Sequence, residues 1–239
     1  MLGGVVALAL ALVRGEEFLG QRDVVWALLA GIAGPLALVF FYRALAVGRM
    51  GIVAPISGVL GAAIPVVVGS LTLGLPAPIQ IGGIGLAIVA VVLVTRSAEE
   101  SAGGTRGIGL AILAGIGFGA FFVLLAQVSH GTAFWPLVFV RVAAGLVLGA
   151  ILLATRTAWR PARAVMNLVL VAAVLDTAGN VFFLFASQQG RLDVAAVLSS
   201  LYPVVTILLA ALLLHERIGR LQAAGIVAAI GAIIFIGAG

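Results

Sequence analysis

The chain has 239 residues, of which 64% are hydrophobic and only 9% are charged, and its mean hydropathy is +1.33. These are too few polar side chains to cover the surface of a water-soluble domain of this length, which excludes that class. The formal net charge is +5 and all basic residues are arginine, but they occur singly at the ends of apolar segments. This pattern is typical of membrane-protein loops and argues against nucleic acid as a partner.

Hydropathy predicts an all-α polytopic membrane bundle with about nine helices, because most apolar segments approach the roughly 20 residues that cross about 30 Å of hydrocarbon. No segment shows the alternation of a lipid-facing barrel strand. In chain order, the predicted spans are Met1–Val13, Val24–Ala46, Gly51–Leu73, Ile79–Thr95, Gly107–Val128, Ala133–Thr155, Val165–Gln188, Val194–Leu214 and Leu221–Gly237.

An internal repeat relates the two halves of the chain, because residues 14–97 reappear weakly but in register 142 positions further on. An odd number of spans per copy would invert one copy relative to the other, as in many secondary transporters. We therefore expect two inverted repeats, residues 1–100 and 101–239, and a transport function. The clearest matches are Gly48-Arg49 with Gly190-Arg191, Ser57 with Ser199, and Gln80-x-x-Gly83 with Gln222-x-x-Gly225.

The repeat also predicts that the first copy is truncated. The second copy has five spans from near Gly107, so its counterpart would begin about 35 residues before Met1. The segment Met1–Val13 is short for a span, and it lacks the basic start and the cleavage site of a signal peptide. We expect one whole helix and part of the next to be missing, through a late start codon or a deletion.

Arginines are distributed unequally between the two sets of loops. The positive-inside rule places the richer set in the cytoplasm and the C-terminus outside. The richer set holds Arg49, Arg96, Arg106, Arg156, Arg160, Arg163, Arg217 and Arg220, and the poorer set holds Arg14, Arg22 and Arg191. The chain has no cysteine, which excludes disulfides and thiolate metal sites.

The C-terminal part resembles the EamA domain of the drug/metabolite transporter superfamily. The resemblance rests on Ala195-Ala196-Val197-Leu198-Ser199-Ser200-Leu201-Tyr202-Pro203, then Leu212-Leu213-Leu214-His215-Glu216-Arg217, then Gln222-x-x-Gly225. The first copy matches less well, because Leu73-Gly74-Leu75-Pro76 lacks the acidic residue of the family's turn.

This resemblance implies ten helices in two inverted halves around a central cavity, with both termini in the cytoplasm. The arginine distribution predicts the opposite side for the C-terminus, and we give slightly more weight to the family's topology. The localisation implied is the plasma membrane, the inner membrane of a bacterium. The motifs concern packing and identify no substrate.

Asp176 is the outstanding polar residue at membrane depth, near the middle of its predicted span. A carboxylate there costs about 2.5–3.5 kcal/mol, so it should face a wet cavity, be protonated or be paired. Asn180 and Ser187 follow on the same helical face, with Phe183 among them. This stripe indicates a proton-coupling or substrate-amine site, and a structural ion pair is the alternative.

Arg141 is the expected partner of Asp176, since adjacent antiparallel spans would place it within a turn of the same depth. A permanently charged guanidinium would hold Asp176 ionised, which argues against proton coupling. Two other interpretations are that Arg141 meets an anionic substrate or that it extends to the nearer membrane interface.

Further candidates for the substrate pathway lie in other predicted spans. Ser199 and Tyr202 precede or flank Pro203, which frees a backbone carbonyl and can kink its helix. Pro55 and Pro65 can act similarly in the first half, and Tyr42 can line a cavity or belong to the interfacial aromatic belt. Gly115-x-x-x-Gly119 indicates close helix packing and no site.

No catalytic, metal or cofactor motif accompanies these residues, so we expect no enzyme and no cofactor. The predicted function is secondary transport by alternating access, exporting a small organic metabolite or drug-like compound. The expected partners are this substrate and the lipid bilayer, and proton coupling and a homodimer are compatible with the sequence. The alternative from another class is a non-transporting membrane protein, either a scaffold or an inert truncated fragment.

Overall fold

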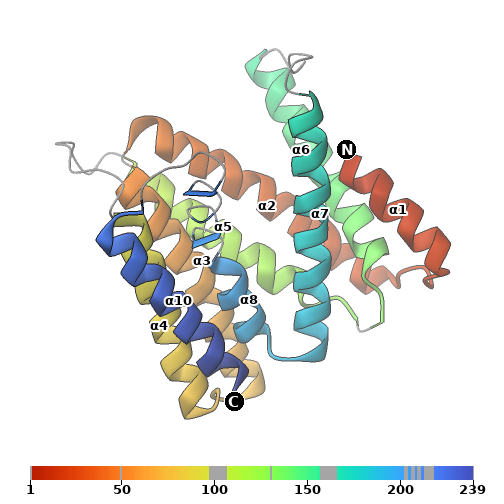
Figure 1. Cartoon of the computed structure of the whole chain (residues 1–239). Coiled ribbons are helices and arrows are strands. Elements are labelled where there is room, and N and C mark those ends of the chain that lie inside the picture. The colour runs from red at the N-terminus through yellow and green to blue at the C-terminus, as the bar shows by residue number, and fades with distance from the viewer. Residues whose placement is uncertain are drawn as a thin grey trace. The chain divides into compact units, whose positions relative to one another are not determined.

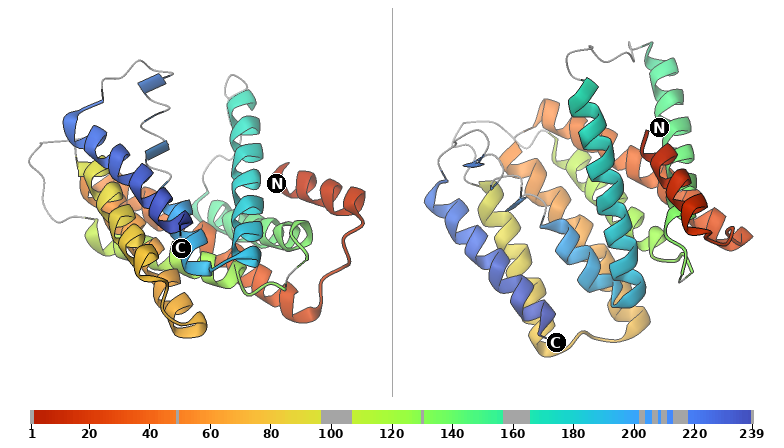
Figure 2. Two further views of the ribbon diagram at one scale, coloured as in Figure 1. Left: turned by 60° about the horizontal axis from the view of Figure 1, so that its bottom comes forward. Right: turned by 45° about the vertical axis from the view of Figure 1, so that its right-hand side comes forward.

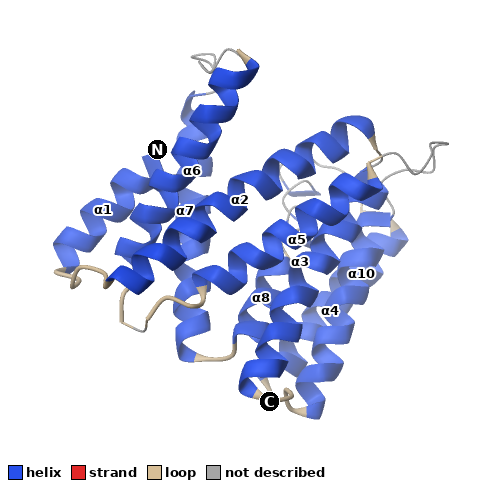
Figure 3. Ribbon diagram, turned by 180° about the vertical axis from the view of Figure 1, so that it is seen from behind, coloured by secondary structure: helices blue, strands red, loops and turns tan. Residues whose placement is uncertain are grey.

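The computed structural model describes residues 2–48, 50–96, 107–129, 131–156, 166–201, 204–205, 208, 211–212 and 218–238. These residues form helices joined by short loops, and the part of the chain described contains no strand (Figures 1 and 3). The helices are α1 (Leu2–Arg14), α2 (Gln21–Val47), α3 (Met50–Leu73), α4 (Pro78–Arg96), α5 (Ile108–Leu125), α6 (Phe134–Thr155), α7 (Met166–Gln189), α8 (Leu192–Ser200) and α10 (Arg220–Gly237).

The helical bundle predicted from hydropathy is confirmed. Five of the described helices contain a stretch long and apolar enough to cross a membrane, in α2, α3, α5, α6 and α7. Helices form because a hydrocarbon environment offers no water to satisfy backbone groups, so each segment must satisfy them internally. Between α3 and α4 the chain turns at Gly74, whose φ of 80° suits glycine, and the prolines that follow cannot continue a helix.

One predicted span is described only in part. The predicted span Val194–Leu214 contains α8, which begins at Leu192 and ends at Ser200. Leu201 and Val204 donate to carbonyls three residues earlier, at 3.2 and 3.0 Å, and the described residues 204–205, 208 and 211–212 are helical. Pro203 and the other residues of this span lie outside the described part of the chain, so one continuous helix over the whole span stays a prediction.

The residues divide into two compact units, and the first comprises Met1–Leu36 and Phe121–Gln189. In it, α1 packs on α6 and α7, while the first part of α2 approaches α6 at Gly31. A Cβ on Gly31 would lie 2.7 Å from the Cβ of Ala143, so only glycine allows this separation. Its buried core is made largely of small and aromatic residues: Ala7, Ala11, Ala27, Ala30, Leu125, Phe134, Leu137, Val140, Phe183 and Leu184.

The second unit comprises Ala37–Ala120 and Gly190–Gly239. Its α4 and α10 lie side by side and antiparallel, since Gly83 meets Ile236 while Leu86 meets Gly231 (Figure 2). Helix α5 packs on α3, where a Cβ on Gly115 would lie 2.6 Å from the Cβ of Leu60. Close packing by this glycine motif agrees with the interpretation of Gly115-x-x-x-Gly119 as a packing motif.

The residues that define the repeat share local geometry in both copies. Gln80 accepts a hydrogen bond from the N–H of Ala77 at 3.2 Å, and Gln222 accepts one from the N–H of Gly219 at 2.8 Å. Each glutamine therefore caps the start of its own helix, α4 or α10. Ser57 and Ser199 likewise each donate to the carbonyl four residues earlier at 2.8 Å. The repeat, its boundary near residue 100 and its inverted orientation stay predictions.

Candidate functional site

The candidate site is centred on an ion pair between α6 and α7. The guanidinium Nη2 of Arg141 donates to the carboxylate Oδ2 of Asp176, as the sequence suggested. The side chain of Asp176 is 59% exposed and that of Arg141 is 20% exposed. At about 1.5 Å per residue, Asp176 lies about 15 Å from the start of α7 and about 20 Å from its end, close to the middle of a span.

Helix α1 provides the space for the arginine side chain. A Cβ on Gly4 would lie 3.1 Å from the Cβ of Arg141, and a Cβ on Gly3 would lie 3.3 Å from its Nε. The Nε of Arg141 is buried and has no acceptor among the described residues. The pair is therefore bounded by α1 on the side of the arginine and is open on the side of the aspartate.

The rest of the predicted polar stripe is only partly available. Asn180 donates through Nδ2 to the carbonyl of Asp176 at 2.9 Å, and Ser187 donates to the carbonyl of Leu184 at 3.0 Å, so both donors are used within α7. Phe183 is buried and its ring lies 4.6 Å from that of Phe122 between centroids. Along this face of α7, the side chains change from solvent-exposed at Asp176 to buried at Phe183.

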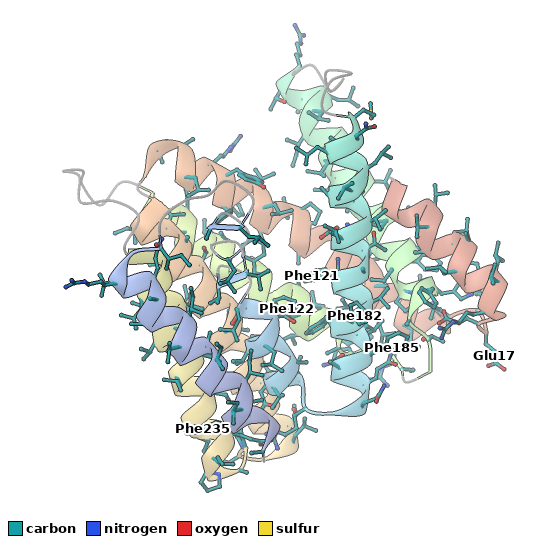
Figure 4. The ribbon with its side chains drawn as sticks, in the orientation of Figure 1. Glu17, Phe121, Phe122, Phe182, Phe185 and Phe235 are labelled. Atoms are coloured by element: carbon teal, nitrogen blue, oxygen red, sulfur yellow. The ribbon has the colours of Figure 1, made fainter. Side chains whose placement is uncertain are left out.

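Aromatic residues of α5 and α7 lie near the packed end of the stripe, where the ring of Phe122 meets that of Phe183. Phe121 and Phe122 come from the end of α5, while Phe182 and Phe185 come from α7 (Figure 4). Phe182 is 71% exposed and Phe122 is half-buried. The face of α7 that carries Asp176 thus has a charged pair at mid-span and the buried ring of Phe183 about two turns further on, whereas Phe182 and Phe185 lie on other faces of the helix.

The other predicted site residues are not brought to this pair within the first unit. Ser199 and Tyr42 belong to the second unit, where Ser199 bonds within α8 and Tyr42 is 65% exposed beside Phe41. Tyr202 and Pro203 lie outside the described residues. Pro55 and Pro65 both lie inside α3, where Pro65 is fully buried, and a functional kink there stays a prediction.

Asp193 is a residue that the sequence interpretation treated only as part of a loop. It lies in the first turn of α8, is fully buried, and accepts hydrogen bonds from Arg191 at 2.8 Å and from the N–H of Val194 at 2.9 Å. Arg191 also donates to the carbonyl of Gly74 at 2.6 Å. The hydrogen bond to Asp193 raises the pKa of Arg191, desolvation opposes this, and the attraction of the carboxylate adds to it. An acid in a first helical turn just after an arginine is the signal in the sequence.

A second network holds the loop between α5 and α6. Glu16 accepts hydrogen bonds from the N–H groups of Ala133, Phe134 and Trp135 at 2.9–3.2 Å and so caps α6. Asp23 accepts from the N–H and hydroxyl of Ser129 at 3.2 and 3.1 Å.

Gln188 completes this network from α7. Its Nε2 donates to the carbonyls of Ser129 and Thr132 at 3.2 and 2.9 Å. These polar groups at one end of the first unit are therefore engaged in holding structure. Among the described residues, no three His, Cys, Asp or Glu side chains gather as they would around a metal ion.

The apolar spans and the ion pair within two of them define a polytopic membrane protein. A profile of the EamA-like transporter family matches residues 105–238, more than half of the chain. The chain belongs to this family, which confirms the resemblance indicated by its motifs and makes it a transporter of the drug/metabolite type.

Comparison of structures agrees with this fold. A solved structure described as "Crystal structure of protein" superposes with a TM-score of 0.82 at 18% identity, covering 99% of this chain and 85% of that chain. At this identity the similarity concerns the fold alone. No curated protein matches the chain by sequence.

Proposed function

We propose that the protein is a secondary transporter of the plasma membrane that exports a small organic metabolite or drug-like compound by alternating access. The observation that carries this proposal is the ion pair between Arg141 and Asp176, within spans α6 and α7. Membership of the EamA-like transporter family supports transport in general. The Arg141–Asp176 ion pair supports a substrate path that passes beside α6 and α7.

The energetic argument starts from the cost of charges at this depth. Each charged side chain at the centre of a span costs about 2.5–3.5 kcal/mol on insertion scales, and such residues commonly mark transport paths. Pairing reduces the cost for Arg141 and Asp176, but an apolar pair would avoid it altogether. Asp176 is also mostly exposed, with Oδ1 free of any hydrogen bond to the described residues. An exposed carboxylate is best accommodated beside water, so we place the substrate path along this face of α7.

Aromatic and amide groups near the pair support an organic substrate. Asn180 keeps its amide oxygen free of partners among the described residues, one turn from Asp176, and the paired rings of Phe183 and Phe122 lie about two turns along the same face. A substrate with a polar group and an apolar body would match this order. A substrate or a proton that binds Asp176 must compete with Arg141, so coupling in this proposal means release of the ion pair.

Untargeted profiling of metabolites inside and outside cells expressing the wild type, Asp176→Asn or Glu17→Gln tests the proposal. Glu17 is exposed in the loop before α2 and points away from the helices, so its variant controls for the loss of one carboxylate (Figure 4). We expect at least one compound to be depleted inside cells with the wild type and the Glu17 variant but not with Asp176→Asn.

The amounts of the three proteins in the membrane are matched before the comparison. Absence of any shifted compound with the wild type present would contradict transport and favour a scaffold or an inert fragment. An equal shift for the wild type and Asp176→Asn would retain transport but remove Asp176 from the path.

A further inference from the structure

A surface hollow of about 440 Å³ lies at the start of α2 and is lined by Gln21, Arg22, Val25 and Trp26. Gln21 and Val25, and likewise Arg22 and Trp26, are one helical turn apart, so the lining follows one face of the first two turns. All four residues belong to the first unit, and none is part of the ion pair at Asp176.

Arg22 brings a positive charge to this hollow that no described residue neutralises with an ion pair. The acidic residue beside it, Asp23, is turned inward, is only 7% exposed, and accepts both hydrogen bonds of Ser129. Glu16, in the loop before α2, is occupied by the N–H groups that begin α6. Two of the acids near Arg22 in sequence are therefore engaged elsewhere, and the third, Glu17, is exposed and forms no ion pair with Arg22 among the described residues.

The polarity of the lining changes with depth along α2. Gln21 and Arg22 stand at the first residues of this membrane-spanning helix, and Val25 and Trp26 lie about 6 Å deeper. Val25 is 49% exposed, so an apolar surface continues directly below the guanidinium. The indole Nε1–H of Trp26 is buried without an acceptor among the described residues. A polar head above an apolar stem is the chemistry of a lipid at the membrane interface.

We propose that this hollow binds an anionic phospholipid. The planar guanidinium of Arg22 pairs with the phosphate, the amide of Gln21 donates to the same headgroup, and Val25 and the Trp26 ring contact the first carbons of an acyl chain. A soluble phosphate would meet Arg22 and Gln21 but would leave Val25 and Trp26 uncovered. The inference is independent of the proposed transport function, because its test measures lipid binding alone.

Native mass spectrometry of the purified chain in neutral detergent tests the site. The chain is titrated with phosphatidylglycerol, with phosphatidylcholine, and with glycerol phosphate as the soluble source of the same phosphate. Arg22→Gln is compared with Arg43→Gln, which removes an exposed arginine near the other end of the same helix. We expect about fivefold weaker retention of phosphatidylglycerol by Arg22→Gln, and wild-type retention by Arg43→Gln.

A further variant, Trp26→Leu, removes the aromatic wall and keeps the positive charge. It should also weaken phosphatidylglycerol binding while leaving the weak binding of glycerol phosphate unchanged. Equal losses for Arg22→Gln and Arg43→Gln would overturn the proposal, because they would indicate general attraction to charge. Binding of glycerol phosphate as tightly as phosphatidylglycerol, or no preference over phosphatidylcholine, would overturn it as well.

Discussion

Asp193 illustrates, at the scale of single residues, how this apolar chain accommodates a carboxylate inside its packing. The side chain is fully buried, and Arg191 and the N–H of Val194 supply its hydrogen bonds. A Cβ on Gly69 of α3 would lie 3.1 Å from the Cβ of Asp193, so a larger residue there would require the carboxylate or the helix to move by a few tenths of an ångström. The charge and its partner are thus supplied by the start of α8, and the space for the carboxylate is supplied by α3.

Replacing Asp193 with asparagine should lower the free energy of unfolding by about 1–3 kcal/mol, because Arg191 loses its charged acceptor. Thermal unfolding in detergent measures this change. The pKa of Arg191 is raised in the folded protein, so its contribution to stability is complete at any pH below the ordinary pKa of arginine. This contribution is lost only when the pH rises through the raised pKa of the folded protein. The difference between the variant and the wild type should therefore be constant from roughly pH 7 to 9. An unchanged unfolding midpoint in Asp193→Asn would show that the pair does not stabilise the fold.

Glu16 gives a second prediction at this scale, with its neighbour as the control. Its carboxylate caps α6 by accepting three backbone N–H groups, and the N-terminal end of a helix favours a negative charge. Glu16→Ala should lower stability by about 1–2 kcal/mol, as loss of a helix cap does. Glu17 is exposed, so Glu17→Ala should leave the unfolding midpoint within the error of the wild type. Equal effects of the two variants would mean that α6 does not depend on this cap.

At the scale of helices, small residues set how closely the spans approach. Helices α4 and α10 form an antiparallel pair in which Gly83 faces the end of α10. Hydrocarbon surrounds such helices and offers no hydrophobic driving force between them, so close backbone approach is what stabilises the contact. The glycines of α4 therefore differ in how closely they face α10, and this difference predicts different effects of replacing them.

Gly83→Ala should destabilise the protein, whereas Gly85→Ala on the same helix should not. A Cβ on Gly83 would lie 2.8 Å from the Cγ1 and 3.0 Å from the backbone N of Ile236, and one on Gly85 would meet nothing within 4 Å. The overpacking costs about 1–3 kcal/mol, while alanine in an open helical position is neutral or slightly favourable. Unfolding midpoints of the two variants in the same detergent measure the difference. A loss for Gly85→Ala as large as for Gly83→Ala would contradict this arrangement.

Most helices could be predicted from the sequence, because length and hydropathy are properties of the segment itself. The predicted and observed boundaries of α3 and α6 differ by a single residue at the start and not at all at the end. In the predicted span Val194–Leu214, α8 ends at Ser200 and the described residues 204–205, 208 and 211–212 are again helical. The hydrogen bonds to carbonyls three residues earlier at Leu201 and Val204 are a local backbone feature that hydropathy does not indicate.

At the scale of the whole molecule, the two compact units do not coincide with the two halves of the sequence. Each unit takes residues from both halves, and α2 and α5 each pass from one unit to the other. The boundary in α2 follows directly after Pro35 and Leu36, inside a continuous helix. A sequence repeat divides the chain by the similarity of its segments, whereas the compact units divide it by contacts between residues. The two divisions therefore need not coincide.

The candidate site could be predicted in part. The pairing of Arg141 with Asp176 followed from charge and depth alone, because two opposite charges in adjacent spans have few other partners. The burial of Phe183 and the use of Asn180 and Ser187 within α7 depend on packing and on local hydrogen bonds that spacing does not show. The network of Glu16, Asp23 and Gln188 joins residues more than 50 positions apart, which no local pattern indicates.

The central claim is that the ion pair between Arg141 and Asp176 lies in the transport path and acts as one unit. The most direct test is the export rate of the compound that profiling identifies, measured for the wild type, Asp176→Asn, Arg141→Gln and the double variant at equal abundance. We predict that each single change reduces export at least tenfold and that the double variant loses much less than the product of the two effects, since neither residue is then left as an unpaired charge. Strictly multiplicative losses, or wild-type export by either single variant, would contradict the claim.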